Sequence, residues 1–347
     1  MKKILVLFLT LTLVEFIAAQ TTIRCLFIGN SYTYVNDLPQ TIKALALGCG
    51  DTLEYESSTP SGCTFGQHLS NSVTTSRIAA GGWDAVVLQE QSQFPAFPIG
   101  QVEAQCFPYA KQLCELIREA TPSANVVFYM TWGRKNGDAG NCGNYPPLCT
   151  YEGMDSLLYE RYTMMAERNQ AAISPVGRVW HVLREQHPEI ELYNADESHP
   201  SLAGTYAAAV TFYSVLFKKS ATCIENDLTL DSETAEAIRE TVETVVCDSL
   251  SYWYRFTNIF NVINTISCIN FQLYPNPSNG YCWIHLFAPA VGELLVYDVC
   301  GKVIHREFFF SDDVMKINLQ NCISGIYFVE LRTRDGKAAR KKLLICN

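Results

Sequence analysis

Two separate segments of the sequence carry residue types that can perform nucleophilic catalysis. Ser31 comes shortly after an apolar run, and Asp196 stands three residues before His199, which is followed by Pro200. A carboxylate at this spacing can lie on the same face of a turn as the histidine and hold its ring in one tautomer. The sequence therefore predicts that Ser31, His199 and Asp196 act as nucleophile, base and orienting acid. Helix capping is the alternative role for Ser31 and Asp196.

The other histidines of the first 200 residues lack a carboxylate at this spacing. An arginine stands three residues before both His181 and His187, and no acidic residue stands at that distance before His68. Because an arginine cannot orient an imidazole as a base, neither histidine is expected to be a catalytic base, and we expect His187 to be a surface residue. His199 is therefore the predicted catalytic base.

A serine hydrolase also needs N–H donors that stabilise the negative charge of the tetrahedral intermediate. The candidates are the backbone N–H of Ser31, the glycine loop at residues 61–64, which contains Gly62, and a side-chain amide of residues 89–92, from either Gln89 or Gln91. All of them follow predicted strands, and the carboxyl ends of parallel strands meet at one edge of a sheet, so we expect them to converge. Gln89 and Gln91 could equally be ordinary loop residues, and Glu90 a structural acid.

The segments that must position these residues alternate between strand and helix patterns from residue 22 to residue 250. Short apolar runs predict strands at residues 23–28, 53–57, 84–89 and 125–131, with a short extended piece at residues 191–193. Helical patterns cover residues 38–48, 102–120, 151–172, 201–217 and 230–250. This alternation predicts an α/β domain with a parallel sheet and helices on both of its faces.

The pattern changes after residue 255. The periodic pattern fades over residues 256–269, which we predict to be a linker, and residues 270–347 contain short β-rich runs. Turn signals separate these runs at residues 275–280, 298–301, 324–325 and 335–336. Such closely spaced turns between β-rich runs predict a small antiparallel β-sandwich.

The first nineteen residues have the pattern of a secretory signal peptide. Lys2 and Lys3 precede an apolar run at residues 4–14, and Ala18 and Ala19 provide small residues before a cleavage site. The run is too short to span a bilayer, so we predict a signal peptide over residues 1–19, with a buried N-terminal helix as the alternative. No later stretch has the length and hydropathy that would predict a transmembrane helix.

Charge and cysteine content limit the partners that the chain can have. The formal net charge is −9, which argues against a protein that binds the phosphates of nucleic acids.

The 14 cysteines all follow the signal and lack the spacing of metal ligands, so no metal site is predicted. In an exported protein we expect cysteines to pair, and a local disulfide is predicted between Cys142 and Cys149. The other pairings stay open.

Four segments resemble, in order, the conserved blocks of the SGNH (GDSL-like) hydrolases. They are Gly29-Asn30-Ser31, the Gly62 loop, the polar turn at residues 89–92 and the segment from Asp196 to Pro200. The resemblance implies a three-layer α/β/α sandwich with a five-stranded, flavodoxin-like parallel sheet over residues 20–255. It also implies ester hydrolysis through an acyl-enzyme on Ser31, with Gly62 as an oxyanion donor and without a cofactor.

The third of these blocks departs from the family pattern. The family has G-x-N-D there, and its Asn side chain donates to the oxyanion, whereas this chain has Gln89-Glu90-Gln91-Ser92. The resemblance places Gln91 at the Asn position, so its longer amide is the expected donor, with Gln89 as the alternative. The departure also favours an alternative from another class, a non-catalytic cell-surface binding protein on the same fold.

Residues 270–347 resemble a type IX secretion sorting domain. The blocks that carry the resemblance are residues 273–280, 296–302, 324–327 and the basic residues 340–342. The resemblance implies that the secretion machinery is a partner and that the protein is left at the cell surface or released. A carbohydrate-binding sandwich is the alternative.

Together these features predict a secreted serine esterase that acts on a small ester or an acylated carbohydrate. An acyltransferase would use the same residues and pass the acyl group to a sugar hydroxyl. Neither a nucleic-acid partner nor a stable membrane span is expected.

Overall fold

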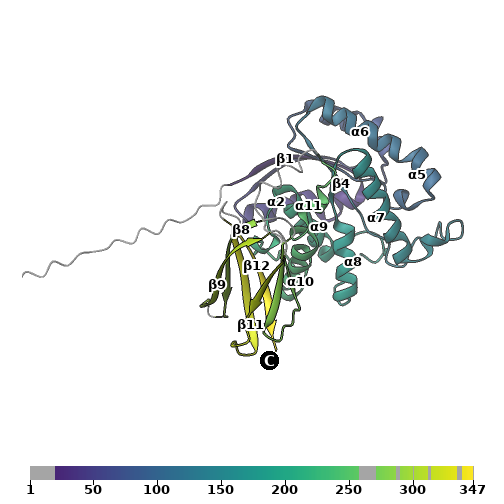
Figure 1. The fold of residues 1–347 in the computed structure, drawn as a ribbon. Coiled ribbons are helices and arrows are strands. Elements are labelled where there is room, and N and C mark those ends of the chain that lie inside the picture. Colours follow the sequence, from purple (N-terminus) through teal and green to yellow (C-terminus); the bar gives the residue numbers. More distant parts are fainter. Residues whose placement is uncertain are drawn as a thin grey trace, which may run out of the picture.

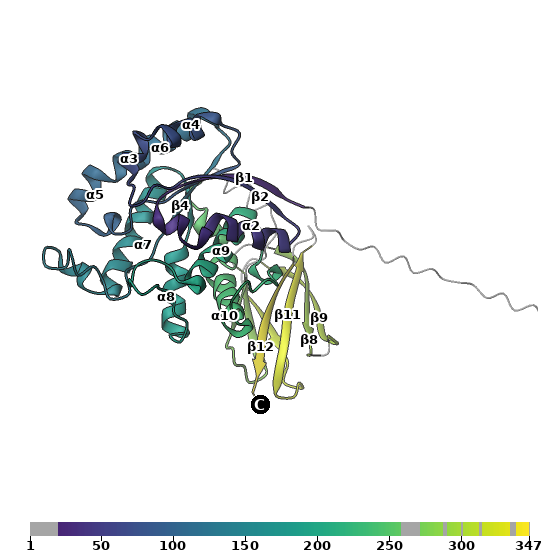
Figure 2. The same ribbon diagram turned by 180° about the vertical axis from the view of Figure 1, so that it is seen from behind.

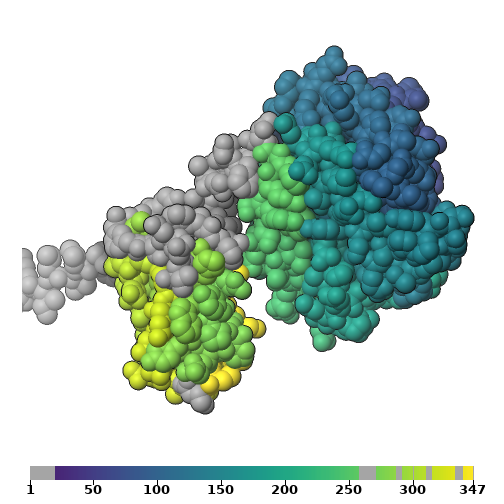
Figure 3. Space-filling view, turned by 45° about the vertical axis from the view of Figure 1, so that its right-hand side comes forward, coloured from purple at the N-terminus to yellow at the C-terminus, as the bar shows by residue number. Residues whose placement is uncertain are grey.

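The computed structural model describes residues 20–257, 271–286, 290–299, 301–311, 314–333 and 338–346. The predicted signal peptide and all but the first two residues of the predicted linker lie outside this part of the chain. Figure 1 shows an α/β domain followed by a β domain, and the two form separate lobes in the space-filling view of Figure 3.

Five parallel strands form the central sheet of the α/β domain, in the order β2-β1-β3-β4-β5. The strands are β1 (Thr22–Ile28), β2 (Thr52–Ser58), β3 (Ala85–Leu88), β4 (Asn125–Tyr129) and β5 (Ala172–Ser174). Every residue of β3 and β5 is buried, as expected for strands that are covered on both faces. The strand order is flavodoxin-like, so the predicted fold class is confirmed.

Helices cover both faces of this sheet. They are α1 (Ser31–Tyr34), α2 (Leu38–Gly48), α3 (Phe65–Leu69), α4 (Ser72–Ala80), α5 (Ile99–Gln105), α6 (Phe107–Ala120), α7 (Tyr151–Arg168), α8 (Val176–Gln186), α9 (Leu202–Phe217), α10 (Ser232–Val242) and α11 (Leu250–Trp253). Figures 1 and 2 show α4 and α6 on one face and α2, α9 and α10 on the other. Every residue of α9 from Ala203 to Phe217 is buried, because α2, α8 and α10 pack around it. None of the helices in the described ranges has the length and hydropathy needed to cross a membrane.

Some predicted boundaries were wrong for local reasons. The helix predicted over residues 102–120 is broken at Cys106, because Pro108 has no N–H to continue the hydrogen-bond ladder. The helix predicted to reach residue 172 ends at Arg168, and β5 follows it. A strand of three residues is too short to give a periodic signal.

Two further segments also differ from the sequence prediction. The helix α8 was not predicted at all. The extended piece at residues 191–193 does not join the sheet; Tyr193 instead forms a single bridge with Pro200. This bridge closes the loop that contains Asp196 and His199.

The C-terminal domain consists of two antiparallel sheets, with the strand orders β10-β7-β6 and β12-β11-β8-β9. The strands are β6 (Phe271–Tyr274), β7 (Tyr281–Leu286), β8 (Ala290–Tyr297), β9 (Val303–Ser311), β10 (Val314–Asn318), β11 (Gly325–Thr333) and β12 (Ala338–Ile345). Residues of both sheets share one apolar core, which includes Phe271, Ile284, Val296, Val329 and Leu343. The domain is therefore the small β-sandwich that the turn pattern predicts.

The predicted local disulfide is present. It joins Cys142 to Cys149, whose Cα atoms are 4.6 Å apart, and closes the loop that precedes α7. The prediction for this pair is confirmed.

Candidate active site

Ser31 lies at the carboxyl-terminal edge of the sheet, where β1 passes into α1. Asn30 is the N-cap of α1, and its side-chain oxygen accepts the backbone N–H of Tyr32 at 3.2 Å. Gly29 has no room for a side chain, because a Cβ atom there would lie 2.6 Å from the amide oxygen of Gln89. The turn is therefore tightly packed, and it holds Ser31 half-buried at the end of the strand.

The structure brings Ser31, His199 and Asp196 together in one chain of hydrogen bonds. Ser31 Oγ lies 2.9 Å from His199 Nε2, and His199 Nδ1 is hydrogen-bonded to the Asp196 carboxylate. The second oxygen of Asp196 accepts the backbone N–H groups of Ser198 at 3.1 Å and His199 at 2.9 Å. Partial burial would raise the pKa of Asp196, but these hydrogen bonds outweigh burial and hold the pKa below its usual value.

Asn36 connects the segment of the nucleophile with the loop of His199. Its side-chain amide donates to the carbonyl oxygens of Pro200 (2.9 Å) and Ser201 (3.2 Å) and to the hydroxyl of Thr205 (2.9 Å). The backbone of Asn36 is left-handed, with φ of 55°, a conformation that asparagine tolerates better than most residues. The loop that carries His199 is thus fastened directly to the residues that follow Ser31.

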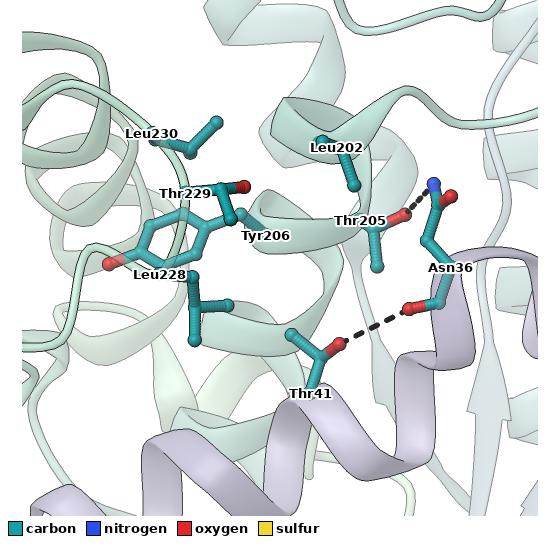
Figure 4. A pocket seen from close by; sticks show the side chains of 8 residues that line it. All are labelled: Asn36, Thr41, Leu202, Thr205, Tyr206, Leu228, Thr229 and Leu230. Carbon is teal, nitrogen blue, oxygen red and sulfur yellow. Dashed lines mark hydrogen bonds between the residues drawn. The ribbon is translucent and has the colours of Figure 1, made fainter.

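A pocket lies beside this contact, between α2 and α9 (Figure 4). Its lining residues are Asn36, Thr41, Leu202, Thr205, Tyr206, Leu228, Thr229 and Leu230. None of the three residues of the Ser31–His199–Asp196 chain lines it, so we do not assign it to the substrate.

Stacked aromatic rings also support the Asp196–His199 turn. The ring of Tyr32 stacks on that of Trp132 with centroids 4.8 Å apart, and Trp132 stacks on Trp180 at 3.8 Å. The Trp132 indole N–H donates to the carbonyl of Ser198 at 3.1 Å, and the hydroxyl groups of Tyr32 and Ser198 are 2.6 Å apart. The edge of the Tyr32 ring also packs against His199. Sequence reasoning missed these aromatic residues, because their spacing along the chain carries no signal.

Gln89 is fully buried, and its amide is used within the protein. The amide oxygen accepts the backbone N–H of Asn30 at 2.9 Å and the hydroxyl of Thr33 at 3.0 Å. The amide nitrogen donates to the side-chain oxygen of Asn30 at 3.0 Å and to the carbonyl of Glu90. Both N–H groups of the amide are therefore occupied. This geometry does not support Gln89 as an oxyanion donor; it indicates that Gln89 positions the residues beside Ser31.

The loop of Gly62 is held close to the nucleophile. The side-chain amide of Asn30 donates to the carbonyl oxygen of Cys63 at 3.0 Å, and Gly62 has the left-handed φ of 65° that favours glycine. Within the described ranges, no hydrogen bond occupies the backbone N–H of Ser31 or of Gly62. Among the described residues two backbone donors are thus free, one on Ser31 itself and one in the Gly62 loop that Asn30 contacts.

Gln91 lies in the loop after β3, and its side chain is engaged within that loop. Its amide nitrogen donates to the side-chain oxygen of Gln93 at 2.9 Å and lies 3.4 Å from the hydroxyl of Ser92. Its amide oxygen is buried and has no hydrogen-bond partner. A buried oxygen without a hydrogen-bond partner costs free energy. In this orientation, therefore, the Gln91 amide leaves one of its hydrogen-bonding groups unused.

Glu90 is buried and joins two loops of the site. Its carboxylate accepts the backbone N–H of Phe65 at 3.0 Å, at the start of α3, and the backbone N–H of Gln91 at 2.7 Å. Burial raises the pKa of Glu90 to about 7, although these N–H groups favour the charged form. Because α3 follows the loop of Gly62, Glu90 links that loop to the loop of Gln91.

Other histidines have partners that the sequence did not reveal. His181 Nδ1 lies 2.9 Å from the carboxylate of Asp155 on α7, so His181 does have a carboxylate partner, contrary to what the residue three positions before it indicated. Local spacing could not show this pair, since the two residues come from different helices. His68 is buried and contacts the carbonyl of Gly29 and the hydroxyl of Thr74, both at 2.9 Å, so it supports the turn before Ser31. In the part of the chain that the structure covers, no three His, Cys, Asp or Glu side chains gather as metal ligands.

The raised pKa of Glu90 predicts a pH-dependent contribution to stability. The pKa is about 7 in the folded chain, against a usual value of 4.5, so the folded state keeps a proton that the unfolded state loses. The contribution of Glu90 to the free energy of unfolding is therefore fully present below pH 4.5, and it is lost as the pH rises towards and through 7. We expect the free energy of unfolding of the unmodified chain, relative to Glu90→Gln, to fall by roughly 1–3 kcal/mol between pH 5 and pH 8.

Denaturant unfolding at both pH values measures this difference. Glu119→Gln, at an exposed position on α6, is the matched control and should show no comparable change between the two pH values. An equal difference between the unmodified chain and Glu90→Gln at pH 5 and pH 8 would contradict the assignment.

Comparison with known proteins gives separate results for the two domains. Residues 272–346 match the family model of the secretion system C-terminal sorting domain. No curated protein matches the chain. A DUF4886 family protein from Bacteroides uniformis is similar in structure, with a TM-score of 0.55 and 18% sequence identity over 69% of this chain and 99% of that chain.

Two other solved structures align with the α/β domain. A candidate SGNH hydrolase from Slackia heliotrinireducens has 26% identity over 56% of this chain and 98% of that chain, with a TM-score of 0.47. A candidate GDSL-like lipase from Parabacteroides merdae has 15% identity over 58% of this chain and 99% of that chain, with a TM-score of 0.44. Residues 272–346 are thus a type IX secretion sorting domain, and the solved structures that align with this chain include a candidate SGNH hydrolase and a candidate GDSL-like lipase.

Proposed function

We propose that the chain is an exported serine esterase, with Ser31 as nucleophile, His199 as general base and Asp196 as the acid that orients His199. The observation that supports this most strongly is the hydrogen-bond chain from Ser31 Oγ through both ring nitrogens of His199 to Asp196. The N-caps of α1 and α9 are Asn30 and Ser201. Helix capping therefore does not account for Ser31 or Asp196.

Acylation begins when Ser31 Oγ attacks the carbonyl carbon of the ester and its proton passes to His199 Nε2. Asp196 stabilises the imidazolium, since its pKa is below the usual value and its carboxylate is ionised at neutral pH. The tetrahedral intermediate then breaks its bond to the alcohol oxygen, which takes the proton from His199 and leaves. Water attacks the acyl-enzyme in the same way, with His199 as base, and its attack releases the acid and restores Ser31.

The developing oxyanion needs donors that are already in place. We assign this role to the backbone N–H groups of Ser31 and Gly62, which have no other acceptor among the described residues. The third donor in this proposal is the side-chain amide of Gln91. Its buried, unpartnered oxygen favours a rotation away from Gln93, and that rotation would free its N–H groups. Gln89 acts only by holding Asn30 and Thr33.

The substrate class that we propose is an acylated carbohydrate. The C-terminal sorting domain indicates export to the cell surface or beyond it, where an esterase would meet extracellular glycans. The signal peptide over residues 1–19 is part of this proposal. An acyltransferase would use the same residues, and the two activities differ only in whether water or a sugar hydroxyl accepts the acyl group.

Removing the nucleophile tests the enzyme proposal. We expect Ser31→Ala to lower kcat/KM for a nitrophenyl acetate by about 10³-fold or more, because no acyl-enzyme can form. Ser123→Ala, at an exposed serine of the same domain, is the matched control and should keep the original rate. Equal rates for the unmodified chain and Ser31→Ala would favour the non-catalytic binding protein.

Two glutamine variants separate the donor from the positioning residue. Gln91→Ala should lower kcat by about 10²-fold and leave the Tm unchanged, because it removes a contact made in the transition state. Gln89→Ala should also lower the stability, by about 1–3 kcal/mol, because it leaves buried groups of Asn30 and Thr33 without partners. Steady-state kinetics and thermal unfolding of both variants provide the test. If Gln91→Ala kept the original kcat, the oxyanion hole would consist of the two backbone donors alone.

A further inference from the structure

Two cysteine thiols meet at the far ends of the helices that follow the nucleophile and the base. Cys49 is the C-cap residue of α2, which begins shortly after Ser31, and Cys223 lies just beyond α9, which begins shortly after His199. Their sulfur atoms are 2.6 Å apart. Carbon atoms in van der Waals contact lie about 3.5–4.0 Å apart, and sulfur is larger, so two separate thiols cannot remain at this distance. The sulfur–sulfur bond of a disulfide, about 2.05 Å, is the chemistry that fits.

We propose that Cys49 and Cys223 form a disulfide in the exported protein. The sorting domain indicates export, and disulfides persist in the oxidising compartments through which exported proteins pass. The bond would join residues 174 positions apart and would link α2 to the segment after α9. The two helices also pack against each other along their length.

The surroundings of the two thiols already hold both backbones in place. The carboxylate of Asp51, two residues after Cys49, is buried and accepts hydrogen bonds from Tyr213 of α9 at 2.9 Å and from the Lys219 ammonium at 2.7 and 2.8 Å. Tyr213 Oη is also 3.2 Å from the sulfur of Cys223. The two chain segments are therefore positioned without the bond, and oxidation needs little further movement.

The bond forms by exchange with an oxidised thiol–disulfide oxidoreductase. The exposed Cys223 thiolate attacks the disulfide of this protein and forms a mixed disulfide. Partial burial and the neighbouring Cys223 raise the pKa of the Cys49 thiol to about 12, so Cys49 reacts second and displaces the oxidoreductase. In total the two cysteines lose two protons and two electrons, and the oxidoreductase leaves as a dithiol.

Peptide mapping of the exported, full-length chain tests this pairing. The protein is alkylated without reduction, digested and examined by mass spectrometry, and we expect a cross-linked peptide that contains Cys49 and Cys223. The disulfide between Cys142 and Cys149 serves as the positive control. The variant Cys247→Ser is the matched control, since Cys247 lies near this site with its sulfur 3.7 Å from the carbonyl of Lys219, and it should keep the cross-link. Alkylation of both Cys49 and Cys223, or a cross-link of either one to Cys247, would overturn the proposal.

Thermal unfolding gives an independent measurement. Cys49→Ser, Cys223→Ser and the double variant should all lose the same roughly 5–15 °C of Tm without reductant, because each removes the same bond. With reductant present, the difference in Tm between the unmodified chain and the double variant should become much smaller, because the bond is then broken in the unmodified chain as well. Additive losses in the two single variants, or a difference that reductant leaves unchanged, would show that no bond joins the two residues.

Discussion

The hydrogen bond between Ser31 and His199 joins residues that are 168 positions apart, and the proposed chemistry depends on it. His199 lies in the loop between α8 and α9, and it belongs to neither a helix nor a strand. Its position therefore depends on contacts with other segments. Asn36 holds the loop through the carbonyls of Pro200 and Ser201, and Trp132 holds it through the carbonyl of Ser198. The stack of Tyr32, Trp132 and Trp180 joins this support to the core of the domain.

The nucleophile turn depends on a different kind of contact, a network of buried polar groups. Asn30, His68, Gln89 and Glu90 are all buried, and each forms at least one hydrogen bond of 2.9–3.0 Å. A buried polar group without a partner would cost about 1–3 kcal/mol, so such a network tolerates few alternative arrangements. In the proposed mechanism this network positions the backbone N–H groups of Ser31 and Gly62 as oxyanion donors. Preorganised donors of this kind cost little free energy of rearrangement during a reaction.

The juxtaposition of Ser31, His199 and Asp196 could be predicted from the sequence, because its main signals are local. The spacing of Asp196 and His199 sets their geometry within one turn, and the apolar run before Ser31 places it at the end of a strand. The central sheet was predictable for the same reason, since buried strands give apolar runs. The role of Gln89 was not predictable, because its partners Asn30 and Thr33 lie on another strand-to-helix junction. The pairing of His181 with a residue of α7 and the stacked aromatic rings likewise depend on contacts between elements distant in the sequence.

The proposed mechanism requires a covalent intermediate on Ser31. Incubation of the exported chain with a fluorophosphonate, followed by digestion and mass spectrometry, tests it most directly, because this reagent forms a covalent bond only with an activated nucleophile. We expect a single label on Ser31 and a much slower reaction in His199→Ala. A label on a different residue, or equal labelling of the unmodified chain and His199→Ala, would show that Ser31 is not a nucleophile activated by His199.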